Sequence, residues 1–132
     1  LARAARQASR LALLLIDVDD FKLVNDNEGH PVGDLALREL ASVLRQAVRP
    51  YDVLARYGGD AFVIMMPECG REEAEERLRD LQAQISAHEV RLPDGRRFNL
   101  AVSIGAAVFP RDGDSSEALL AAADARMYQD KH

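Results

Sequence analysis

Two glycines near the middle of the chain constrain its fold more than any other feature. Gly58 and Gly59 stand between two strand-like runs, 53–56 and 62–66. A Gly-Gly pair in this setting predicts a tight β-hairpin, because both central residues of such a turn need positive φ. Asp60 follows directly, so a carboxylate stands beside bare backbone that a bulky group such as a phosphate can approach. An ordinary hairpin with a solvated aspartate explains the same residues.

A continuous apolar run, Leu11 to Ile16, ends in acidic residues. Its length and lack of alternation predict a strand that is buried on both faces. Asp17 and Asp19 follow where this strand leaves the core, and at a spacing of two they share a face. Two carboxylates repel each other unless a cation lies between them. The pair therefore indicates a metal site, with a solvated strand end as the alternative.

Three stretches have the periodicity of amphipathic helices. Their apolar residues recur every three to four positions over about 34–48, 74–85 and 119–127. Asp34 stands at the start of the first stretch, where a carboxylate can cap a helix. Residues 20–33 are rich in turn formers and lack a clean period, which predicts an irregular segment before that helix.

A second hairpin is expected at 90–98, where Pro93, Asp94 and Gly95 separate two short runs. Residues 98–104 then alternate, as a strand with one apolar face does. The order of strand, helix, hairpin, helix, hairpin and helix predicts an α+β domain with helices packed on one or both faces of a sheet. At 132 residues the chain suits a single domain with a real core.

Charge and composition exclude several classes of protein. The chain has 17 basic and 22 acidic residues and a net charge of −5, which argues against a nucleic-acid binder that relies on bulk charge, though not against a local phosphate pocket. Its single cysteine excludes an internal disulfide. No apolar run approaches the ~20 residues that span a bilayer, so no membrane contact by this domain is expected. Residues 1–10 look like the end of a helix, and we expect a fragment of a longer protein.

Three stretches in a fixed order carry a more specific pattern. They are residues 13–26, which end in Asp-Asp-Phe-Lys-Leu-Val-Asn-Asp, residues 29–34, Gly-His-Pro-Val-Gly-Asp, and residues 56–62, Arg-Tyr-Gly-Gly-Asp-Ala-Phe. Together they resemble the GGDEF family, the diguanylate cyclases, and the resemblance covers nearly all of the chain. It implies a central, mainly antiparallel sheet flanked by helices, like that of nucleotidyl cyclases and polymerase palm domains. In that sheet Asp17 and Asp60 would converge.

The resemblance implies a metal-dependent active site. Asp17, Asp60 and the main-chain carbonyl of Val18 match the family's ligands for Mg²⁺ or Mn²⁺, and Asp60 and Lys22 match catalytic positions. Such an ion clamps a triphosphate and stabilises its leaving pyrophosphate. The family has a glutamate where this chain has Ala61. Losing a charge that helps to hold a metal costs orders of magnitude in rate, so the activity is expected to be impaired. An engineered variant, a weak enzyme and a recently evolved regulator remain three explanations.

The implied substrate is GTP and the implied product is cyclic di-GMP. Asn25 and Asp34 match the guanine readers, and an aspartate that accepts from the N1 and N2 hydrogens discriminates against adenine. The positions that match the family's substrate-binding residues are Asp20, Phe21, Lys22, Asn25, Asp34, Gly58, Gly59 and Lys131. Because one domain holds one GTP, turnover requires a homodimer of GGDEF domains. The need for GTP implies a cytoplasmic location.

A second site is implied upstream of the hairpin. Arg49 and Asp52, three residues apart and at the family's spacing before the Gly-Gly pair, match its inhibitory product site. An arginine grips phosphate or the Hoogsteen edge of guanine, and an aspartate accepts from the Watson–Crick edge. A surface ion pair is the simpler explanation. A different function also stays open: a non-catalytic receptor that binds cyclic di-GMP at Arg49 and Asp52, or GTP at the former active site.

Overall fold

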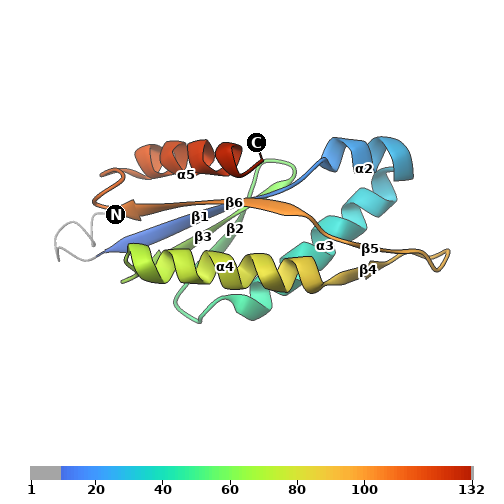
Figure 1. The fold of residues 1–132 in the computed structure, drawn as a ribbon, viewed down its shortest axis with the longest axis horizontal. Coiled ribbons are helices and arrows are strands. Elements are labelled where there is room, and N and C mark those ends of the chain that lie inside the picture. The colour runs from blue at the N-terminus through green and yellow to red at the C-terminus, as the bar shows by residue number, and fades with distance from the viewer. Residues whose placement is uncertain (1–9, 132) are drawn as a thin grey trace.

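The centre of the molecule is a four-stranded antiparallel sheet, shown in Figure 1. The computed structural model describes residues 10–131, so the helix end expected at 1–10 lies, apart from Arg10, outside the described residues. The strand order is β2-β3-β1-β6. The strands are β1 (Leu11–Val18), β2 (Val53–Tyr57), β3 (Ala61–Pro67) and β6 (Val102–Phe109). The predicted α+β class is confirmed, and the strand predicted to be buried on both faces is the central strand β1.

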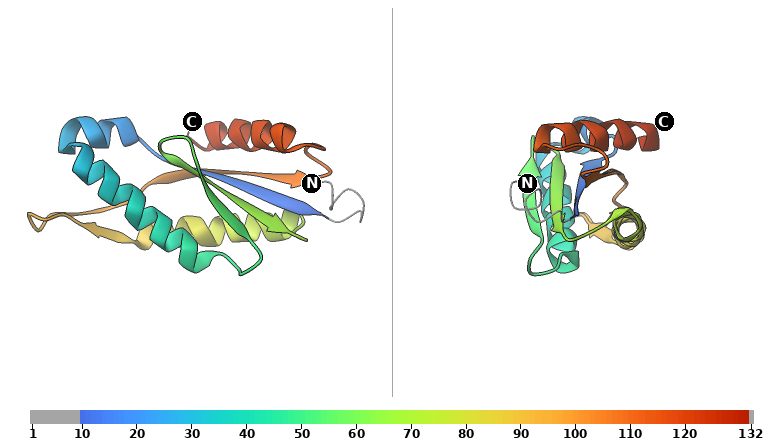
Figure 2. Two further views of the ribbon diagram at one scale, coloured as in Figure 1. Left: turned by 180° about the vertical axis from the view of Figure 1, so that it is seen from behind. Right: turned by 90° about the vertical axis from the view of Figure 1, so that its left-hand side faces the viewer.

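Helices cover both faces of this sheet, as Figures 1 and 2 show. Because side chains alternate along a strand, Leu13 and Leu14 of β1 point to opposite faces and belong to different apolar clusters. The face with Leu13 packs against α5 (Ser116–Lys131), and the other packs against α3 (His30–Ala47) and α4 (Arg71–Ala87). The core is therefore split by the sheet into two layers.

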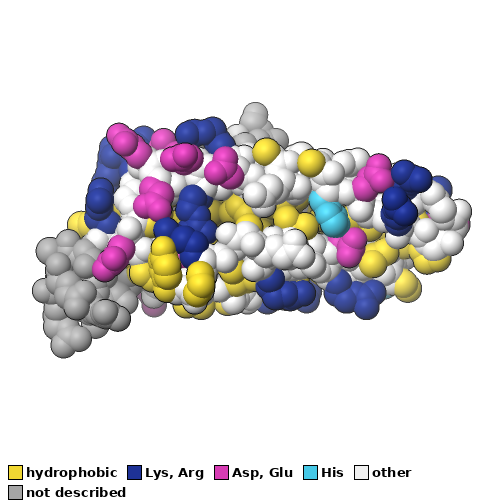
Figure 3. Space-filling model, turned by 90° about the horizontal axis from the view of Figure 1, so that it is seen from below, with side chains coloured by type: hydrophobic (Ala, Val, Ile, Leu, Met, Phe, Trp, Pro, Cys, Tyr) yellow, Lys and Arg dark blue, Asp and Glu magenta, His cyan; other side chains and the backbone are white. Residues whose placement is uncertain are grey.

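One face of the molecule carries charged side chains of both signs. Figure 3 shows the side that α4 covers, where acidic and basic side chains are interspersed rather than separated by sign. Within residues 10–131, no helix combines the length and the apolarity that crossing a bilayer requires. The face shown is therefore of mixed charge, with hydrophobic side chains between the charged ones.

The segment predicted to be irregular is mostly helical, and this expectation was wrong. Residues 20–33 contain α2 (Phe21–Glu28) and the first turn of α3. Gly29, with φ at 91°, separates the two helices. Pro31 lies in the first turn of α3, where its missing amide costs nothing. The helix thus begins four residues earlier than expected, and Asp34 does not cap it.

The last part of the sheet also differs from the expectation. The second hairpin is present as β4 (Glu89–Arg91) and β5 (Arg97–Asn99), but it forms a separate two-stranded sheet. The strand expected over 98–104 is interrupted, because β5 ends at Asn99 and β6 begins at Val102. Between them, the carbonyl of Ala101 accepts a hydrogen bond from the amide of Asp19 at 2.8 Å. This bond ties the interruption to the end of β1.

Candidate functional site

The hairpin tip is open but is not the expected two-residue turn. Ala61 already pairs with the residue before Gly58, so Gly58, Gly59 and Asp60 form a three-residue connection. Only Gly58 of the two glycines has positive φ, at 68°. A Cβ added to either glycine would meet nothing within 4 Å. The backbone of the tip is therefore accessible to a ligand, as the sequence predicted.

The hairpin tip lies beside the end of β1. Asp17 is paired with Ala61 across the β1–β3 ladder. The amide of Val18 donates to the carbonyl of Asp60 at 3.4 Å. Asp17 and Asp60, 43 positions apart in the sequence, are thus brought to neighbouring positions on one edge of the sheet. We call this edge, formed by Asp17, Val18 and Asp60, the acidic edge.

The donor set of the acidic edge suits a hard divalent cation. Two carboxylates and a main-chain carbonyl supply oxygen only, which Mg²⁺ prefers. Among residues 10–131, no group of three or more His, Cys, Asp or Glu side chains comes together as a metal cluster. Mg²⁺ commonly binds through one or two carboxylates and takes its other ligands from water and phosphate. The residues present therefore fit a magnesium ion that is shared with a phosphorylated ligand.

Asp19, next to the acidic edge, is held by β6. Its carboxylate accepts a hydrogen bond from the hydroxyl of Ser103 at 2.5 Å. Ser103 is itself buried and pairs with Asp17 in the β1–β6 register. Asp19 therefore has a structural role that the sequence did not indicate.

Ala61 provides no ligand at this edge. Its side chain is buried in the apolar layer beneath α5, together with Leu15, Val63 and Met127. Directly opposed residues in an antiparallel pair point to the same face of the sheet. A glutamate at position 61 would therefore extend beside Asp17 on the face that α5 covers.

The start of α2 lies next to the acidic edge. Asp20 precedes the helix in the left-handed region, with φ at 55°. Phe21 is half-buried and Lys22 is exposed. The first amides of a helix lack partners within the helix, so the first turn of α2 is suited to hold phosphate oxygens. Lys131 is the last residue of α5, and its side chain lies outside what the structure describes.

Asn25 and Asp34, the two residues expected to bind the guanine base, lie on the adjoining helices α2 and α3. Asn25 of α2 packs against Gly33 of α3 so closely that a Cβ at Gly33 would overlap its side-chain oxygen. That oxygen, Oδ1, is buried and has no hydrogen-bond partner among the described residues. Asp34 is exposed and lines a cavity of about 850 Å³ between α3 and β2. The other polar or aromatic residues that line this cavity are Arg38, Arg45, Arg56 and Phe62.

The Arg49 and Asp52 motif forms an ion cluster with α4. The Asp52 side chain is fully buried and accepts hydrogen bonds from the Arg49 amide at 2.8 Å and from Arg49 Nη2 at 3.2 Å. Arg77 Nη2 donates to the same carboxylate at 2.8 Å. Arg49 Nη1 reaches Glu73 at 2.9 Å, and its guanidinium lies 4.6 Å from the ring centre of Tyr51. We call Arg49, Asp52 and Arg77 the arginine corner.

The two arginines of the arginine corner lower the pKa of Asp52. Burial alone would raise the pKa of Asp52, but the hydrogen bonds from Arg77 and Arg49 outweigh it and hold that pKa below its usual value. Arg77 Nη1 is buried without a hydrogen-bond partner among the described residues. The sequence did not reveal Arg77, because its place beside Asp52 depends on how α4 lies against the 49–52 turn. No sequence motif marks this arginine.

The family of the chain follows from comparison with known proteins. The family model described as "Diguanylate cyclase, GGDEF domain" matches residues 1–132. The chain belongs to the GGDEF family. A GGDEF domain of YfiN from Pseudomonas aeruginosa has 36% sequence identity and a TM-score of 0.92, with 98% of this chain and 81% of that one covered.

Two further relatives are similar over nearly the whole GGDEF domain. The response regulator PleD of Caulobacter vibrioides is 38% identical over 130 residues, which cover 98% of this chain but 29% of PleD. The GGDEF domain of DgcB from Caulobacter crescentus, solved in complex with c-di-GMP, has 29% identity and a TM-score of 0.91 over 98% of this chain and 77% of that one. The chain therefore spans less than a third of the length of PleD.

Proposed function

We propose that this GGDEF domain belongs to a diguanylate cyclase that condenses two GTP molecules to cyclic di-GMP in a dimer, with turnover impaired by Ala61. In this reaction each 3′-hydroxyl attacks the α-phosphorus of the other GTP, so that two phosphodiester bonds form and two pyrophosphates leave. The observation that carries the proposal is the convergence of Asp17 and Asp60 at the acidic edge, beside an open glycine turn. A site that holds triphosphate next to a bound cation is what this chemistry needs.

The residues around the acidic edge would position GTP. The first turn of α2 would receive the β- and γ-phosphates, with Lys22 and Lys131 as counter-charges and Gly58 and Gly59 beneath the nucleotide. Asp34, exposed in the large cavity, would accept from guanine N1 and N2. The unpartnered buried oxygen of Asn25 offers a second acceptor, since buried polar atoms are rarely left without a partner. These contacts would orient the base and select it against adenine.

Asp17, Asp60 and the Val18 carbonyl would hold Mg²⁺ or Mn²⁺ at the acidic edge. When bound, the ion would neutralise phosphate charge and activate the 3′-hydroxyl. Ala61 contributes only a buried methyl group at the matching position. The site would therefore bind the nucleotide while stabilising the transition state poorly.

The arginine corner would bind the product. Arg49, on the loop between α3 and β2, would grip a phosphate or guanine edge of cyclic di-GMP. The corner lies at the opposite end of β2 from Gly58, so product bound there would not compete directly for the acidic edge. Because GTP is the substrate, the domain would face the cytoplasm.

Calorimetric titration with Mg²⁺-GTP, and separately with cyclic di-GMP, tests this proposal. We expect GTP binding that Asp34→Ala strongly weakens, and cyclic di-GMP binding that Arg49→Ala strongly weakens. Cyclic di-GMP binding without any GTP binding would overturn the proposal and make the domain a receptor. Slow product formation in a dimer forced by a fused coiled coil would support the catalytic role directly.

A further inference from the structure

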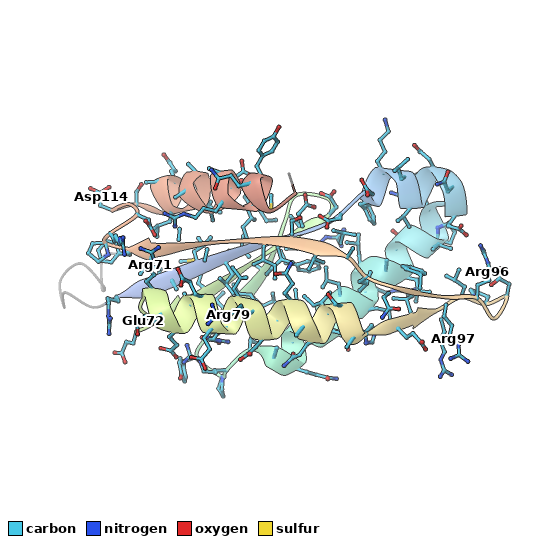
Figure 4. The ribbon with its side chains drawn as sticks, in the orientation of Figure 1. Arg71, Glu72, Arg79, Arg96, Arg97 and Asp114 are labelled. Carbon is cyan, nitrogen blue, oxygen red and sulfur yellow. The ribbon has the colours of Figure 1, made fainter. Side chains whose placement is uncertain are left out.

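The β4–β5 hairpin reaches α2 through one arginine. Figure 4 shows Arg96 near the far end of this hairpin, with Arg97 beside it. The two Nη atoms of Arg96 donate to the two carboxylate oxygens of Glu28, the last residue of α2, at 2.7 and 3.3 Å. Asp94 accepts from Arg96 Nε at 2.6 Å and so orients the guanidinium. The result is a forked, two-bond contact, the arrangement that arginine and a carboxylate form most specifically.

The helix that Arg96 contacts packs on α3, and its half-buried Phe21 lies against the apolar core. No residue of α2 is buried. The helix approaches α3 closely at Gly33, where an added Cβ would overlap Asn25 and crowd Phe21. On the hairpin side, Val24, Leu92 and Phe98 line a cavity of about 170 Å³. The ion pair therefore bridges a region where apolar packing is incomplete, and α2 is the kind of element that opens locally at low cost.

We propose that Arg96 and Glu28 are positioning residues, which fix α2 so that it can bind the nucleotide. This inference rests on the proposed function, because Asn25 and the first turn of α2 are the groups assigned to GTP. Glu28 lies three residues after Asn25, so the two project from neighbouring positions on the helix surface. A shift of Glu28 would move the Asn25 oxygen and the phosphate-binding turn together. Arg96 thereby contributes to GTP affinity without touching the ligand.

The substitution Glu28→Gln separates positioning from simple charge. Removing a negative charge near a triphosphate site strengthens binding if only long-range electrostatics act. The positioning role predicts the opposite. We expect the Kd for Mg²⁺-GTP, measured by calorimetry, to rise about threefold to fivefold, the upper range for an exposed but well-formed ion pair.

The same hairpin supplies a matched control. Glu89 pairs with Arg97 at 3.3 Å, and both side chains are about half exposed. Glu89→Gln removes the same charge and breaks an ion pair of the same kind, but one that does not reach α2. Its Kd for Mg²⁺-GTP should stay within measurement error of the unmodified protein. A loss equal to that of Glu28→Gln would show that hairpin stability, not the link to α2, is responsible.

Amide hydrogen exchange provides a readout that needs no nucleotide. Glu28→Gln should speed exchange in residues 21–28 while leaving the thermal midpoint and cyclic di-GMP binding unchanged. Unchanged exchange in α2, or GTP binding as tight as before, would overturn the positioning role. If the unmodified protein binds no GTP, the proposed function fails, and the exchange data still decide whether the ion pair holds α2.

Discussion

The arginine corner and the acidic edge differ in how their charges are arranged. The corner pairs opposite charges, whereas the edge places like charges next to each other. In the corner, Asp52 lies between two guanidinium groups and its side chain is fully buried. At the edge, Asp17 and Asp60 are neighbours, and Asp19 and Asp20 follow two and three positions after Asp17. Both sites match motifs of one family, yet their electrostatic designs are opposite.

A site of paired opposite charges and a site of like charges should respond differently to a ligand. A site with internal ion pairs contributes to folding without ligand, and its ligand must replace part of an existing network. A site of like charges gains from each cation that enters it. We therefore expect substitutions in the corner to affect stability and product affinity together. Substitutions at the edge should affect metal and nucleotide binding but leave stability nearly unchanged.

The largest expected effect comes from completing the acidic edge. Ala61→Glu would place a third carboxylate beside Asp17, and we expect turnover of a forced dimer to rise by on the order of 10²–10³-fold, the range for one transition-state-stabilising group. The measurement is the rate of cyclic di-GMP formation from Mg²⁺-GTP. A dimeric Ala61→Glu protein that binds GTP but makes no product would contradict the catalytic assignment.

The matched control for this variant is Ala61→Gln. Glutamine has nearly the size of glutamate but no charge, so it disturbs the apolar layer under α5 equally. It should not raise turnover. In addition, Mg²⁺ should raise the thermal midpoint of Ala61→Glu more than that of Ala61→Gln, because only the former adds a carboxylate for the cation to neutralise.

A smaller effect tests whether the two sites bind different ligands. Asp34→Ala should weaken Mg²⁺-GTP by about a hundredfold, since it removes a charged acceptor for two guanine donors, and should leave cyclic di-GMP binding intact. Arg49→Ala should produce the reverse pattern. Calorimetry on both variants with both ligands checks this. If either variant loses both ligands equally, the two sites are not separate.

Stability should distinguish the corner from the edge. Asp52→Asn leaves Arg49 and Arg77 facing a neutral group, and we expect a loss of about 2 kcal/mol in the free energy of unfolding, less than for a wholly buried pair because both arginines are partly exposed. Asp60→Asn should be neutral or slightly stabilising without Mg²⁺. Urea unfolding measures both values.

The exposed pair of Arg71 and Glu75 provides the control for the corner. Both side chains are about half exposed, four residues apart on α4. Glu75→Gln should therefore cost less than about 0.5 kcal/mol. An Asp52→Asn loss no larger than this would mean that the corner is an ordinary surface ion pair.

The sequence predicted those parts of the fold that depend on local pattern. The apolar run of Leu11 to Ile16 predicted a buried strand, and the Gly-Gly pair predicted a hairpin, although not the length of its turn. It missed α2, because the polar turn formers of 21–28 favour a helix only when Asn25 packs on Gly33 and Glu28 meets Arg96. Such contacts are tertiary and override local preference.

In the candidate sites, too, local motifs indicate some residues and only tertiary contacts reveal others. The motifs indicated Asp17, Asp60, Arg49 and Asp52, and the structure shows how close the members of each pair lie. Their chemical roles stay predictions. Arg77 carries no motif, and its contact with Asp52 spans 25 positions. That contact depends on how α4 packs on the sheet, so no local sequence pattern could have predicted it.

The smallest expected effect concerns an ion pair remote from both sites. Asp112, before α5, accepts two hydrogen bonds from Arg126 and one from the Val108 amide. Burial alone would raise its pKa, but these hydrogen bonds outweigh burial and lower the pKa from 3.8 to about 2. A depressed carboxyl pKa adds stability above the unfolded value near 4, and this contribution fades as the pH falls from about 4 to about 2. Because Arg126 is half exposed, we expect Asp112→Asn to cost about 1 kcal/mol at pH 7.

Urea unfolding of the unmodified protein and Asp112→Asn at pH 7 and pH 3 tests the sign of this effect. The difference in unfolding free energy between the two proteins should shrink at pH 3, because the native carboxyl then loses part of its advantage over the unfolded one. Asp124→Asn, on the exposed surface of the same helix, should show little difference at either pH. If the Asp112→Asn deficit is the same at both pH values, the residue acts through packing alone.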